Sequence, residues 1–464
     1  MNGGAGTWSG DVLVVGAGPA GLAVAAECAR RGLTVLLVDE NQRPGGQITR
    51  RRFLDRPSGS GPDVEPSVPE GVSFRSGTVC HGFRDGRQAV LTSGHELWRT
   101  RTRAVVIATG AAEKVLPVPG WTLPGVMTAG AAQTFLKGSG FLPYRRVLVA
   151  GSGPLLLAVA SQLISAGVRV VGVAEATRPG ARQWRDALRT LAAPGLLAQG
   201  AGYTVRLARA GVRVRTGTGI ARIEGDGRVT GARLRRLRRD WSFAGTPEEH
   251  VACDAVLLSH GFSSAADLAA QGGADIEWDA QRQTWRPVRD VGFRTSVPWI
   301  RAVGDCAGVG GAQRAELEGR LAGMLLAAEL TGRPAGSGRI RSLRRRLDRL
   351  ETFRRGMDRL FRPGLGAASW PEPETQVCRC QESTRAEVDR AMDNGVADLH
   401  ALKLWTRAGM GPCQGRICAP VLSTLLAARG HEPARLPPPS IRYPVRPLPI
   451  AALCRSAAPE GGQR

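Results

Sequence analysis

The pattern of apolar positions near the N-terminus predicts a strand, a glycine turn, a helix and a second strand. Residues 11–15, DVLVV, form a β-branched apolar run, which is typical of a strand buried on both faces of a parallel sheet. The turn GAGPAG follows at 16–21, a helix extends to about residue 31, and residues 33–38 form the next strand. This order predicts a βαβ unit of the kind that binds a dinucleotide.

The glycines of this turn have separate structural tasks. Gly16 permits the tight turn, Gly18 lets the backbone approach a pyrophosphate, and Gly21 lets the helix pack closely on the strand. Asp39 ends the second strand about twenty residues beyond the motif, where a ribose hydroxyl needs a carboxylate. The phosphates are expected at the helix N-terminus, because its unpaired N–H groups and its dipole favour anions.

The same order of elements recurs from residue 146. A strand over 147–151 leads into a second turn, GSGPLL at 151–156, which is followed by a helix and by a strand that ends at Glu175. Leu156 stands where a third glycine normally allows close packing, so we expect the helix and strand to be pushed apart and the phosphate pocket to be altered. The terminal acid favours the 2'-hydroxyl of NAD(H). Another adenine nucleotide, or a unit that only packs, is the alternative.

Four of the nine cysteines are concentrated near the C-terminus. Cys378 and Cys380 are one residue apart, and thirty-two residues separate them from Cys413, which is followed by Cys418. Two helices predicted between the pairs can bring both cysteine loops to one end of a small helical module. Four thiolates in a compact pocket suit a 2Fe-2S cluster. A structural zinc is the alternative, since four cysteines also bind zinc tetrahedrally.

The other cysteines stand alone in the sequence. Cys28, Cys80, Cys253 and Cys306 belong to no C-x-x-C or C-x4-C pair, and we expect them to be small hydrophobic core or loop residues. The odd cysteine count does not suit a secreted disulfide framework and favours a reducing compartment. The sequence shows neither a signal-peptide pattern nor a run of about 18 apolar residues. The expected location is the cytoplasm.

The formal net charge of +23 would ordinarily indicate an anionic partner. Only Lys114, Lys137 and Lys403 are lysines, so the charge is almost entirely arginine in a chain rich in alanine and glycine, as a G+C-biased genome would produce. We therefore expect no nucleic-acid partner.

Residues 340–362 form a further predicted helix, which is basic and carries one apolar stripe. Its apolar side chains recur at alternating steps of three and four. The helix either packs the nucleotide-binding domains against the cysteine-containing module with its arginines in solvent, lies on an anionic membrane as a peripheral contact, or docks a partner subunit. The stripe consists of Ile340, Leu343, Leu347, Leu350, Phe353, Met357 and Leu360.

Four segments in order resemble the two-dinucleotide-binding-domain flavoproteins. They are the first glycine turn, RPGGQITRR at 43–51, AVVIATGA at 104–111 and IRAVGDCAG at 300–308. The resemblance implies that the first unit binds FAD, with Asp305 at its ribityl or pyrophosphate end, and that the second unit is an insertion that binds NAD(H). The implied FAD contacts are Gly16, Gly18, Pro19, Ala20, Gly21, Asp39, Glu40, Gly45, Gly46, Gln47, Ala108, Thr109, Gly110, Gly304 and Asp305, and those of the second nucleotide are Gly151, Gly153 and Glu175.

The cysteine region is similar to bacterioferritin-associated ferredoxin. In that family the four corresponding positions ligate a 2Fe-2S cluster, which implies Cys378, Cys380, Cys413 and Cys418 as the metal ligands here.

Three C-terminal stretches resemble the alpha subunits of opine oxidases, hydrogen cyanide synthase and hydroxyproline or proline dehydrogenases. They are VCRCQEST at 377–384, LKLWTRAGMGPCQGRIC at 402–418 and RYPVRPLPIAAL at 442–453. In those complexes a beta subunit similar to D-amino-acid oxidase oxidises the substrate, sometimes with a small ferredoxin-like gamma subunit, while the alpha subunit handles electrons. The resemblance implies the same partners for this chain.

These features predict an α/β fold with two Rossmann-like, three-layer nucleotide-binding domains, the second inserted in the first, and a small helical C-terminal iron–sulfur module. For 464 residues, two to four domains are expected. The predicted division is 8–115 and 256–335 for the two parts of the FAD-binding domain, 116–255 for the NAD(P)-like domain, 336–370 for the basic linker helix, 371–430 for the ferredoxin-like module and 431–464 for a Pro/Arg-rich tail.

The leading functional hypothesis is an FAD- and 2Fe-2S-dependent electron-transfer subunit of a heteromeric amine, amino-acid or opine dehydrogenase or oxidase. The second is a self-sufficient NAD(P)H-dependent FAD oxidoreductase that reduces an acceptor protein. The third is a non-enzymatic iron–sulfur binding subunit. Spacing alone places no catalytic acid, base or nucleophile, and we expect surface or packing roles for the six scattered histidines.

Overall fold

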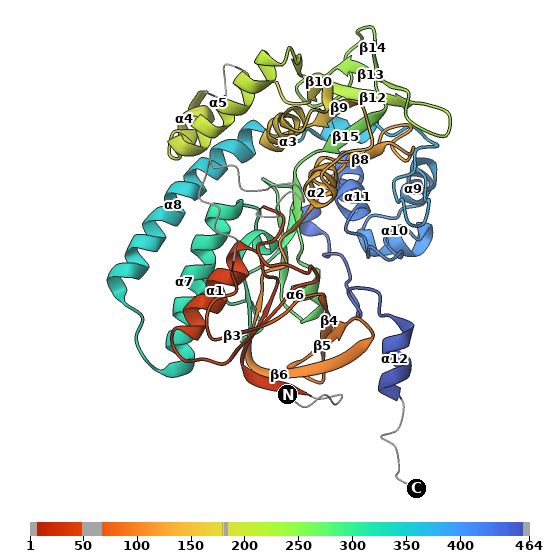
Figure 1. The fold of residues 1–464 in the computed structure, drawn as a ribbon. Coiled ribbons are helices and arrows are strands. Elements are labelled where there is room, and N and C mark those ends of the chain that lie inside the picture. The colour runs from red at the N-terminus through yellow and green to blue at the C-terminus, as the bar shows by residue number, and fades with distance from the viewer. Residues whose placement is uncertain (1–6, 49–66, 179, 181–183, 458–464) are drawn as a thin grey trace.

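The computed structural model describes residues 7–48, 67–178, 180 and 184–457. Two Rossmann-like units confirm the predicted α/β fold, and a helical C-terminal part lies beside them (Figure 1). Residues 49–51 of the predicted loop at 43–51 lie outside the described residues.

The first sheet begins with the predicted N-terminal strand. It contains β1 (Trp8–Val15), β2 (Val35–Val38), β3 (Val72–Arg75), β4 (Thr78–Arg84), β5 (Gln88–Ser93), β6 (Glu96–Ile107) and β19 (Ile300–Ala302). The strand order is β3-β2-β1-β6-β5-β4, with β19 paired to β6. The pairs β4–β5 and β5–β6 run antiparallel, and the remaining pairs are parallel.

Both faces of the first sheet are covered, which explains the continuous apolar run of β1. Val12 clusters with Val24 of α1 (Pro19–Ala29) and Leu326 of α7 (Ala312–Thr331) on one face. Leu13 points to the opposite face, because side chains alternate along a strand. There it clusters with Leu268 of α6 (Asp267–Gln271).

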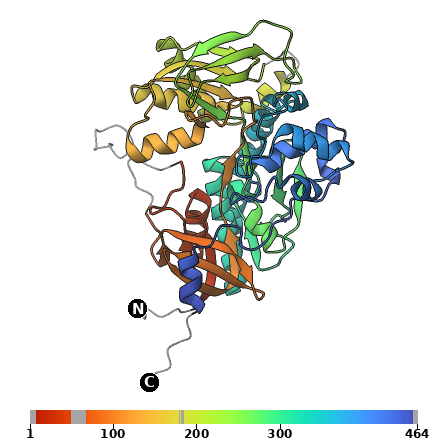
Figure 2. The ribbon, with the colours of Figure 1, turned by 90° about the vertical axis from the view of Figure 1, so that its right-hand side faces the viewer.

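The second sheet is parallel and has the order β11-β10-β9-β15-β8. Its strands are β8 (Val126–Thr128), β9 (Arg146–Gly151), β10 (Arg169–Glu175), β11 (Val214–Thr216) and β15 (Ala255–Ser259). One face carries α2 (Ala129–Ser139), α3 (Pro154–Ser165) and α5 (Pro194–Arg209), and the other carries the antiparallel strands β12 (Thr218–Glu224), β13 (Gly231–Arg236) and β14 (Glu249–Ala252). Figure 2 shows this domain above the first.

One predicted boundary needs correction. Residues 256–259 were assigned to the first domain, but β15 pairs with β9 and β8 inside the second sheet. The chain returns to the first domain after Ser259, because the apolar run 255–258 is buried by the second sheet. The two connections between the first and the second domain lie side by side, since β7 (Ala111–Glu113) pairs with β16 (Phe262–Ser264). A further hairpin, β17 (Ile276–Asp279) and β18 (Thr284–Pro287), follows α6.

The predicted basic helix is α8 (Ser337–Leu360), which lies along α7 and α4 (Trp184–Thr190). Leu343 and Phe353 of its apolar stripe are buried. Leu343 belongs to the core cluster of α1 and α7, and Ile340 and Leu347 pack against that cluster. The stripe is therefore used for packing within the chain, on the core of α1 and α7; that the helix packs these domains against the cysteine-containing module stays a prediction.

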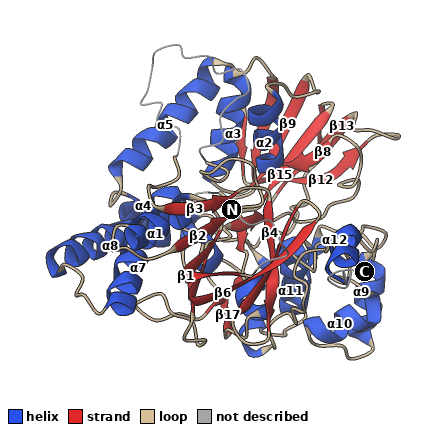
Figure 3. Ribbon diagram, turned by 60° about the horizontal axis from the view of Figure 1, so that its bottom comes forward, coloured by secondary structure: helices blue, strands red, loops and turns tan. Residues whose placement is uncertain are grey.

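The C-terminal part forms a helical module with a core of its own. It comprises η3 (Leu365–Ser369), α9 (Arg385–Asp393), α10 (Leu399–Thr406) and α11 (Cys418–Ala428), and its core includes Val388, Leu402 and Leu422. The module helices α9 and α10 lie to one side of the sheets (Figure 3). After η4 (Pro433–Arg435) the tail leaves the module and ends in α12 (Ile450–Ala457), which packs on β6 (Figure 2). In the described part of the chain, no helix combines the length and the apolar character needed to cross a bilayer.

Candidate functional site

Two glycines of the first turn are required by close backbone contacts. Gly16 adopts φ +107°, and a Cβ there would lie 2.4 Å from the carbonyl oxygen of Ala108 on the neighbouring strand. A Cβ on Gly21 would lie 1.8 Å from the carbonyl oxygen of Gly16. These positions let β1, β6 and α1 approach one another, as predicted.

Gly18 meets a different environment. Its φ is −74°, and none of the described atoms lies within 4 Å of the place where its Cβ would be. It precedes α1, which starts with Pro19 and, among the described residues, has neither a capping side chain nor an acid in its first turn. The space beside Gly18 at the start of this helix is therefore open, which suits the diphosphate of a dinucleotide.

Asp39 holds the glycine turn in place. Its Oδ2 accepts the N–H of Ala17 at 2.6 Å, and its Oδ1 accepts the backbone and side-chain N–H groups of Asn41 at 2.8 Å. Each carboxylate oxygen has further lone-pair capacity, so the same group can accept a ribose hydroxyl. Glu40 is exposed and lies 3.7 Å from the guanidinium of Arg446 in the tail.

The predicted loop after β2 lies directly on this turn. The N–H of Gly45 donates to the carbonyl oxygen of Ala17 at 2.7 Å, and a Cβ on Gly46 would lie 3.2 Å from the second glycine of the turn. Gln47 accepts the Thr134 hydroxyl of α2 at 3.1 Å. The loop therefore connects the first turn to the second domain.

Two more predicted segments end at the same sheet edge. After β6, the N–H of Ala108 donates to β1, and Thr109 donates its hydroxyl to the carbonyl oxygen of Ala265 at 3.1 Å. After β19, Asp305 accepts the N–H groups of Gly310 and Gly311 at 2.8 and 3.0 Å. The carboxyl edge of the first sheet thus gathers the predicted FAD contacts, including Gly110 and Gly304, around the open space at Gly18.

A buried carboxylate that the sequence analysis missed supports this edge. Glu318 of α7 accepts the N–H of Gly304 at 2.9 Å and is paired with Arg289 and Arg314, each at 2.8 Å. Burial opposes ionisation of Glu318, but these guanidinium groups and the N–H outweigh it and hold its pKa below the ordinary value of 4.5. Arg289 and Glu318 are 29 residues apart in segments without a motif, so no sequence signal joins them.

The second glycine turn has a related but altered geometry. A Cβ on Gly151 would lie 1.7 Å from the carbonyl oxygen of Ser259, whereas no described atom lies within 4 Å of a Cβ on Gly153. Glu175 accepts the N–H of Gly153 at 2.9 Å and that of Thr177 at 2.8 Å. Burial raises the pKa of Glu175, against the effect of these two hydrogen bonds.

A leucine stands in the second turn where the first has its third glycine. The Leu156 side chain is fully buried in the core under α3. Gly153 adopts φ +109° where the equivalent Gly18 adopts −74°. The Glu175 carboxylate accepts the N–H of the third residue of this turn, whereas Asp39 accepts the N–H of the second residue of the first turn. The two turns therefore follow different backbone paths, and the expected change in the phosphate pocket stays a prediction.

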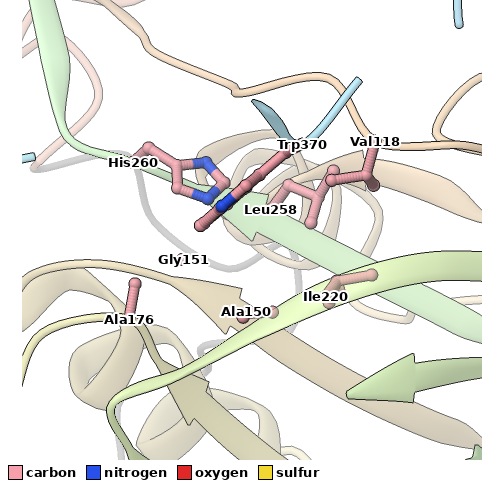
Figure 4. A pocket seen from close by; sticks show the side chains of 9 residues that line it. Val118, Ala150, Gly151, Ala176, Ile220, Leu258, His260 and Trp370 are labelled. Carbon is pink, nitrogen blue, oxygen red and sulfur yellow. The ribbon is translucent and has the colours of Figure 1, made fainter. Parts of the chain in front are cut away.

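A cavity of about 10 Å³ adjoins the second turn (Figure 4). Trp370, at the end of η3, stacks on Trp241 at 5.8 Å and meets the ring of His260 at 5.6 Å. Burial, with the charge of Lys114, lowers the pKa of His260 to about 3, so its ring is neutral and accepts the N–H of Leu116. A volume of this size holds about one water molecule, so the cavity is far too small for a dinucleotide. It is lined by Val118, Ala150, Gly151, Ala176, Gly219, Ile220, Leu258, His260 and Trp370.

The predicted cysteine quartet comes together as two pairs. Cys378 and Cys418 are within hydrogen-bonding reach of each other. So are Cys380 and Cys413. Across the described residues, no three His, Cys, Asp or Glu side chains are arranged to hold a single metal ion. Two pairs suit a binuclear cluster, in which each iron takes two thiolates, better than zinc, which gathers four around one centre.

The two pairs differ in exposure and in acidity. Cys378 and Cys418 are each 1% exposed, whereas Cys413 is half-buried and Cys380 is exposed. The Cys418 thiol, followed by backbone N–H groups, lowers the pKa of Cys378 to about 5, although burial opposes this. The same contact raises the pKa of Cys418. The site thus has an inner pair with one thiolate and an outer pair at the surface.

The solitary cysteines and one further histidine have packing roles. Burial raises the pKa values of Cys28, Cys80, Cys253 and Cys306 to about 12, which leaves them as unreactive thiols. His81 is also buried, and its ring bonds to the hydroxyl of Thr92 at 2.7 Å.

Comparisons with known proteins agree with this arrangement. Residues 10–319 match the pyridine nucleotide-disulphide oxidoreductase family, and residues 376–428 match the BFD-like [2Fe-2S] binding domain. An opine oxidase subunit from Agrobacterium tumefaciens (strain Ach5) is 36% identical over 96% of this chain and 91% of its own length. The HcnB subunit of hydrogen cyanide synthase from Pseudomonas aeruginosa is 34% identical over 95% of this chain and 97% of its own length.

A solved structure shares the fold across the whole chain. L-proline dehydrogenase from P. horikoshii has a TM-score of 0.68 and 20% identity, and the match covers 96% of this chain and 79% of that one. The two matched families indicate binding of FAD or NAD(P) and of a 2Fe-2S cluster. The chain is therefore an FAD-dependent oxidoreductase that belongs to the pyridine nucleotide-disulphide oxidoreductase family, in the group that includes these opine oxidase and hydrogen cyanide synthase subunits.

Proposed function

We propose that this chain is the electron-transfer subunit of a heteromeric amine, amino-acid or opine dehydrogenase or oxidase. Its relatives are named as subunits of an opine oxidase and of hydrogen cyanide synthase, which supports a role beside a partner. The partner we infer is a beta subunit similar to D-amino-acid oxidase, which oxidises the substrate. A small ferredoxin-like gamma subunit fits the same assembly.

The distribution of the cysteines carries this proposal. The four solitary cysteines named above are buried, unreactive thiols, so the redox-active thiols expected of a disulfide reductase are not found among them. The quartet, by contrast, is paired and reaches the surface at Cys380. Electrons that enter the first domain therefore have the quartet as their exit.

The residues of the first sheet edge bind and orient FAD in this proposal. The N–H groups at the start of α1 hold its diphosphate over Gly18, and Asp39 accepts a ribose hydroxyl. Asp305 approaches the ribityl or pyrophosphate end, in a segment that Glu318 keeps in place. When bound, FAD supplies two-electron chemistry and the 2Fe-2S cluster supplies one-electron transfer.

The quartet provides the ligands of the cluster. Cys378 and Cys418 would ligate the cluster from the interior, and Cys380 and Cys413 would ligate it from the surface. The bound thiolates need no side-chain rearrangement within each pair, because the sulfurs already meet. The exposed pair places the exit for electrons where an acceptor protein can reach it.

The test is to purify the chain alone and with a coexpressed beta subunit of the D-amino-acid oxidase type. We expect FAD, iron and sulfide in the chain by itself. Under anaerobic conditions an amine or amino-acid substrate should bleach the FAD and cluster absorbance only in the complex. Bleaching of the isolated chain by the same substrate, or a purified chain without FAD, would contradict the proposal.

The second turn supports NAD(P)H-dependent reduction of an acceptor protein as the second candidate function. Glu175 ends the second strand beside the turn, where it accepts the N–H of Gly153, and an acid at this strand end is the residue type that binds a ribose 2'-hydroxyl. Titration with NADH and with ATP distinguishes the possibilities: anaerobic bleaching by NADH assigns an electron-donor site, and binding of ATP without bleaching assigns an adenine-nucleotide site.

A further inference from the structure

Arg416 lies between two cysteines of the quartet and connects three distant segments. Its guanidinium forms an ion pair with Asp267, the first residue of α6, and donates to the carbonyl oxygen of Val445 in the tail at 3.0 Å. The same side chain also approaches the carbonyl oxygen of Cys413 at 3.4 Å. The Arg416 and Asp267 side chains are only 14% and 13% exposed, so water screens this contact weakly.

The residues just before Asp267 are hydrogen-bonded to a predicted FAD-binding segment. Ala265, two residues earlier, donates its N–H to the carbonyl oxygen of Gly110 at 3.1 Å and accepts the hydroxyl of Thr109 at 3.1 Å. A short series of bonds therefore leads from the segment after β6, through the start of α6, to the loop between Cys413 and Cys418.

The tail reinforces the same connection from the other side. The N–H of Val445 donates to the carbonyl oxygen of His81 on β4 at 2.9 Å, and the ring of His81 lies 3.1 Å from the carbonyl oxygen of Arg446. Val445 is 2% exposed. Arg416 thus holds a stretch of tail that is itself hydrogen-bonded to the first sheet.

Other contacts of the module reach both domains. Trp121 donates its indole N–H to the carbonyl oxygen of Gln376 at 2.8 Å, and Arg222 pairs with Glu372 at 2.5 Å. Trp285 of β18, in the first domain, packs against the apolar core of the module. The Arg416–Asp267 pair differs from these contacts, because it joins a ligand loop to the domain that carries the first glycine turn.

We propose that Arg416 is a positioning residue that, through Asp267 and the tail, fixes the cysteine module against the first domain and so sets the separation of the two cofactor sites. This inference rests on the proposed function, in which both sites are used. Removing one member of a buried ion pair leaves the other charge buried without a partner, which is strongly destabilising. We therefore expect the contact between the module and the first domain to open when the Arg416–Asp267 pair is broken. A shift of about 1 Å between reacting groups can cost roughly 100-fold in rate.

The experiment uses the full chain with FAD and cluster bound. Asp267→Asn removes the ion pair from outside the ligand loop, and Arg390→Ala, on the exposed surface of α9, is the matched control. A pulse of one electron equivalent is delivered anaerobically, and the rate at which charge redistributes between FAD and cluster is followed by absorbance. We expect at least a roughly tenfold slower redistribution in Asp267→Asn, with unchanged FAD, iron and sulfide content, and the wild-type rate in Arg390→Ala.

Equal rates in wild type and Asp267→Asn would overturn the inference while leaving the proposed function intact. No redistribution in the wild type would instead overturn the proposed function, and this inference with it. A second readout is independent of electron transfer: hydrogen exchange at the Val445 amide should accelerate in Asp267→Asn and in Arg416→Gln. The charge-swapped double variant Asp267→Arg/Arg416→Asp should recover protection at that amide; failure of both single variants to alter exchange would also count against the inference.

Discussion

The carboxylate of Glu318 accepts the backbone N–H of Gly304 at 2.9 Å, which ties the middle of α7 to the turn after β19. Arg289 donates to both oxygens of this carboxylate, at 2.8 and 3.0 Å. The segment that carries Asp305 is therefore positioned by a buried charged pair and not by its own local sequence.

Glu318→Gln should lower both stability and FAD retention. The variant leaves the buried guanidinium of Arg289 without its anion, and breaking a buried pair in this way costs about 3–5 kcal/mol. We expect a lower free energy of unfolding by that amount and loss of bound FAD, measured by denaturant unfolding of the apo-protein and by the flavin absorbance of the purified protein. Glu316→Gln, an exposed neighbour on the same helix, is the control. Full FAD content in Glu318→Gln would show that the pair does not position the site.

The lowered pKa of Glu318 predicts how the free energy of unfolding depends on pH. The pKa of Glu318 is lower in the folded protein than its ordinary value of 4.5, so its stabilising contribution is complete above that value. The contribution is lost as the pH falls below 4.5 through the folded-state pKa. Unfolding curves of wild type and Glu318→Gln should therefore converge as the medium is acidified from pH 4.5 downwards, and a constant difference would contradict this assignment.

Gly18→Ala should separate FAD binding from folding. The φ of −74° tolerates alanine and no described atom obstructs the new methyl group, so the free energy of unfolding of the apo-protein should change by less than about 1 kcal/mol. The methyl group would occupy the space proposed for the diphosphate, and FAD affinity should fall strongly in a fluorescence titration. Gly200→Ala, in an equally open helical position of α5, should leave FAD affinity unchanged. Normal FAD affinity in Gly18→Ala would place the diphosphate elsewhere.

Cys380→Ser should reduce the iron and acid-labile sulfide of the purified chain from about two of each per chain towards zero. Cys454→Ser, at an exposed cysteine of α12, should leave both unchanged. Metal and sulfide analysis, together with the electron paramagnetic resonance signal after dithionite reduction, checks the result. One zinc per wild-type chain, without sulfide, would contradict the cluster assignment.

Lys114→Met should change the pH dependence of stability at alkaline pH. Burial lowers the pKa of Lys114 to about 8, against the attraction of Asp279, and its ammonium donates to the carbonyl oxygens of Arg282 and Gln283. Between pH 8 and 10.5 the unfolded chain therefore binds this proton more than the folded chain does, so the free energy of unfolding rises with pH. We expect wild type to gain about 3 kcal/mol over this interval relative to Lys114→Met. Parallel pH profiles of the two proteins would refute the lowered pKa.

The sequence predicted the repeated units because each rests on short-range constraints. A continuous apolar run, glycines at fixed spacing and an acid at the next strand end are local requirements of one βαβ unit, and Gly16, Gly21 and Asp39 occupy the expected places. That Leu156, in place of the third glycine, alters the phosphate pocket of the second turn stays a prediction. The boundary at 255 was missed because an apolar strand looks the same in either sheet.

What the amino-acid sequence determined by itself is the set of parts: two glycine turns, a basic helix with an apolar stripe, and a quartet of cysteines. Their relations were decided by the tertiary structure. Glu318 with Arg289, Arg416 with Asp267, and Trp370 beside the second turn are partners from distant segments, and no spacing rule links them. The physical reason is that a buried charge or ring must find its partner in space, and only the packed fold brings those segments together.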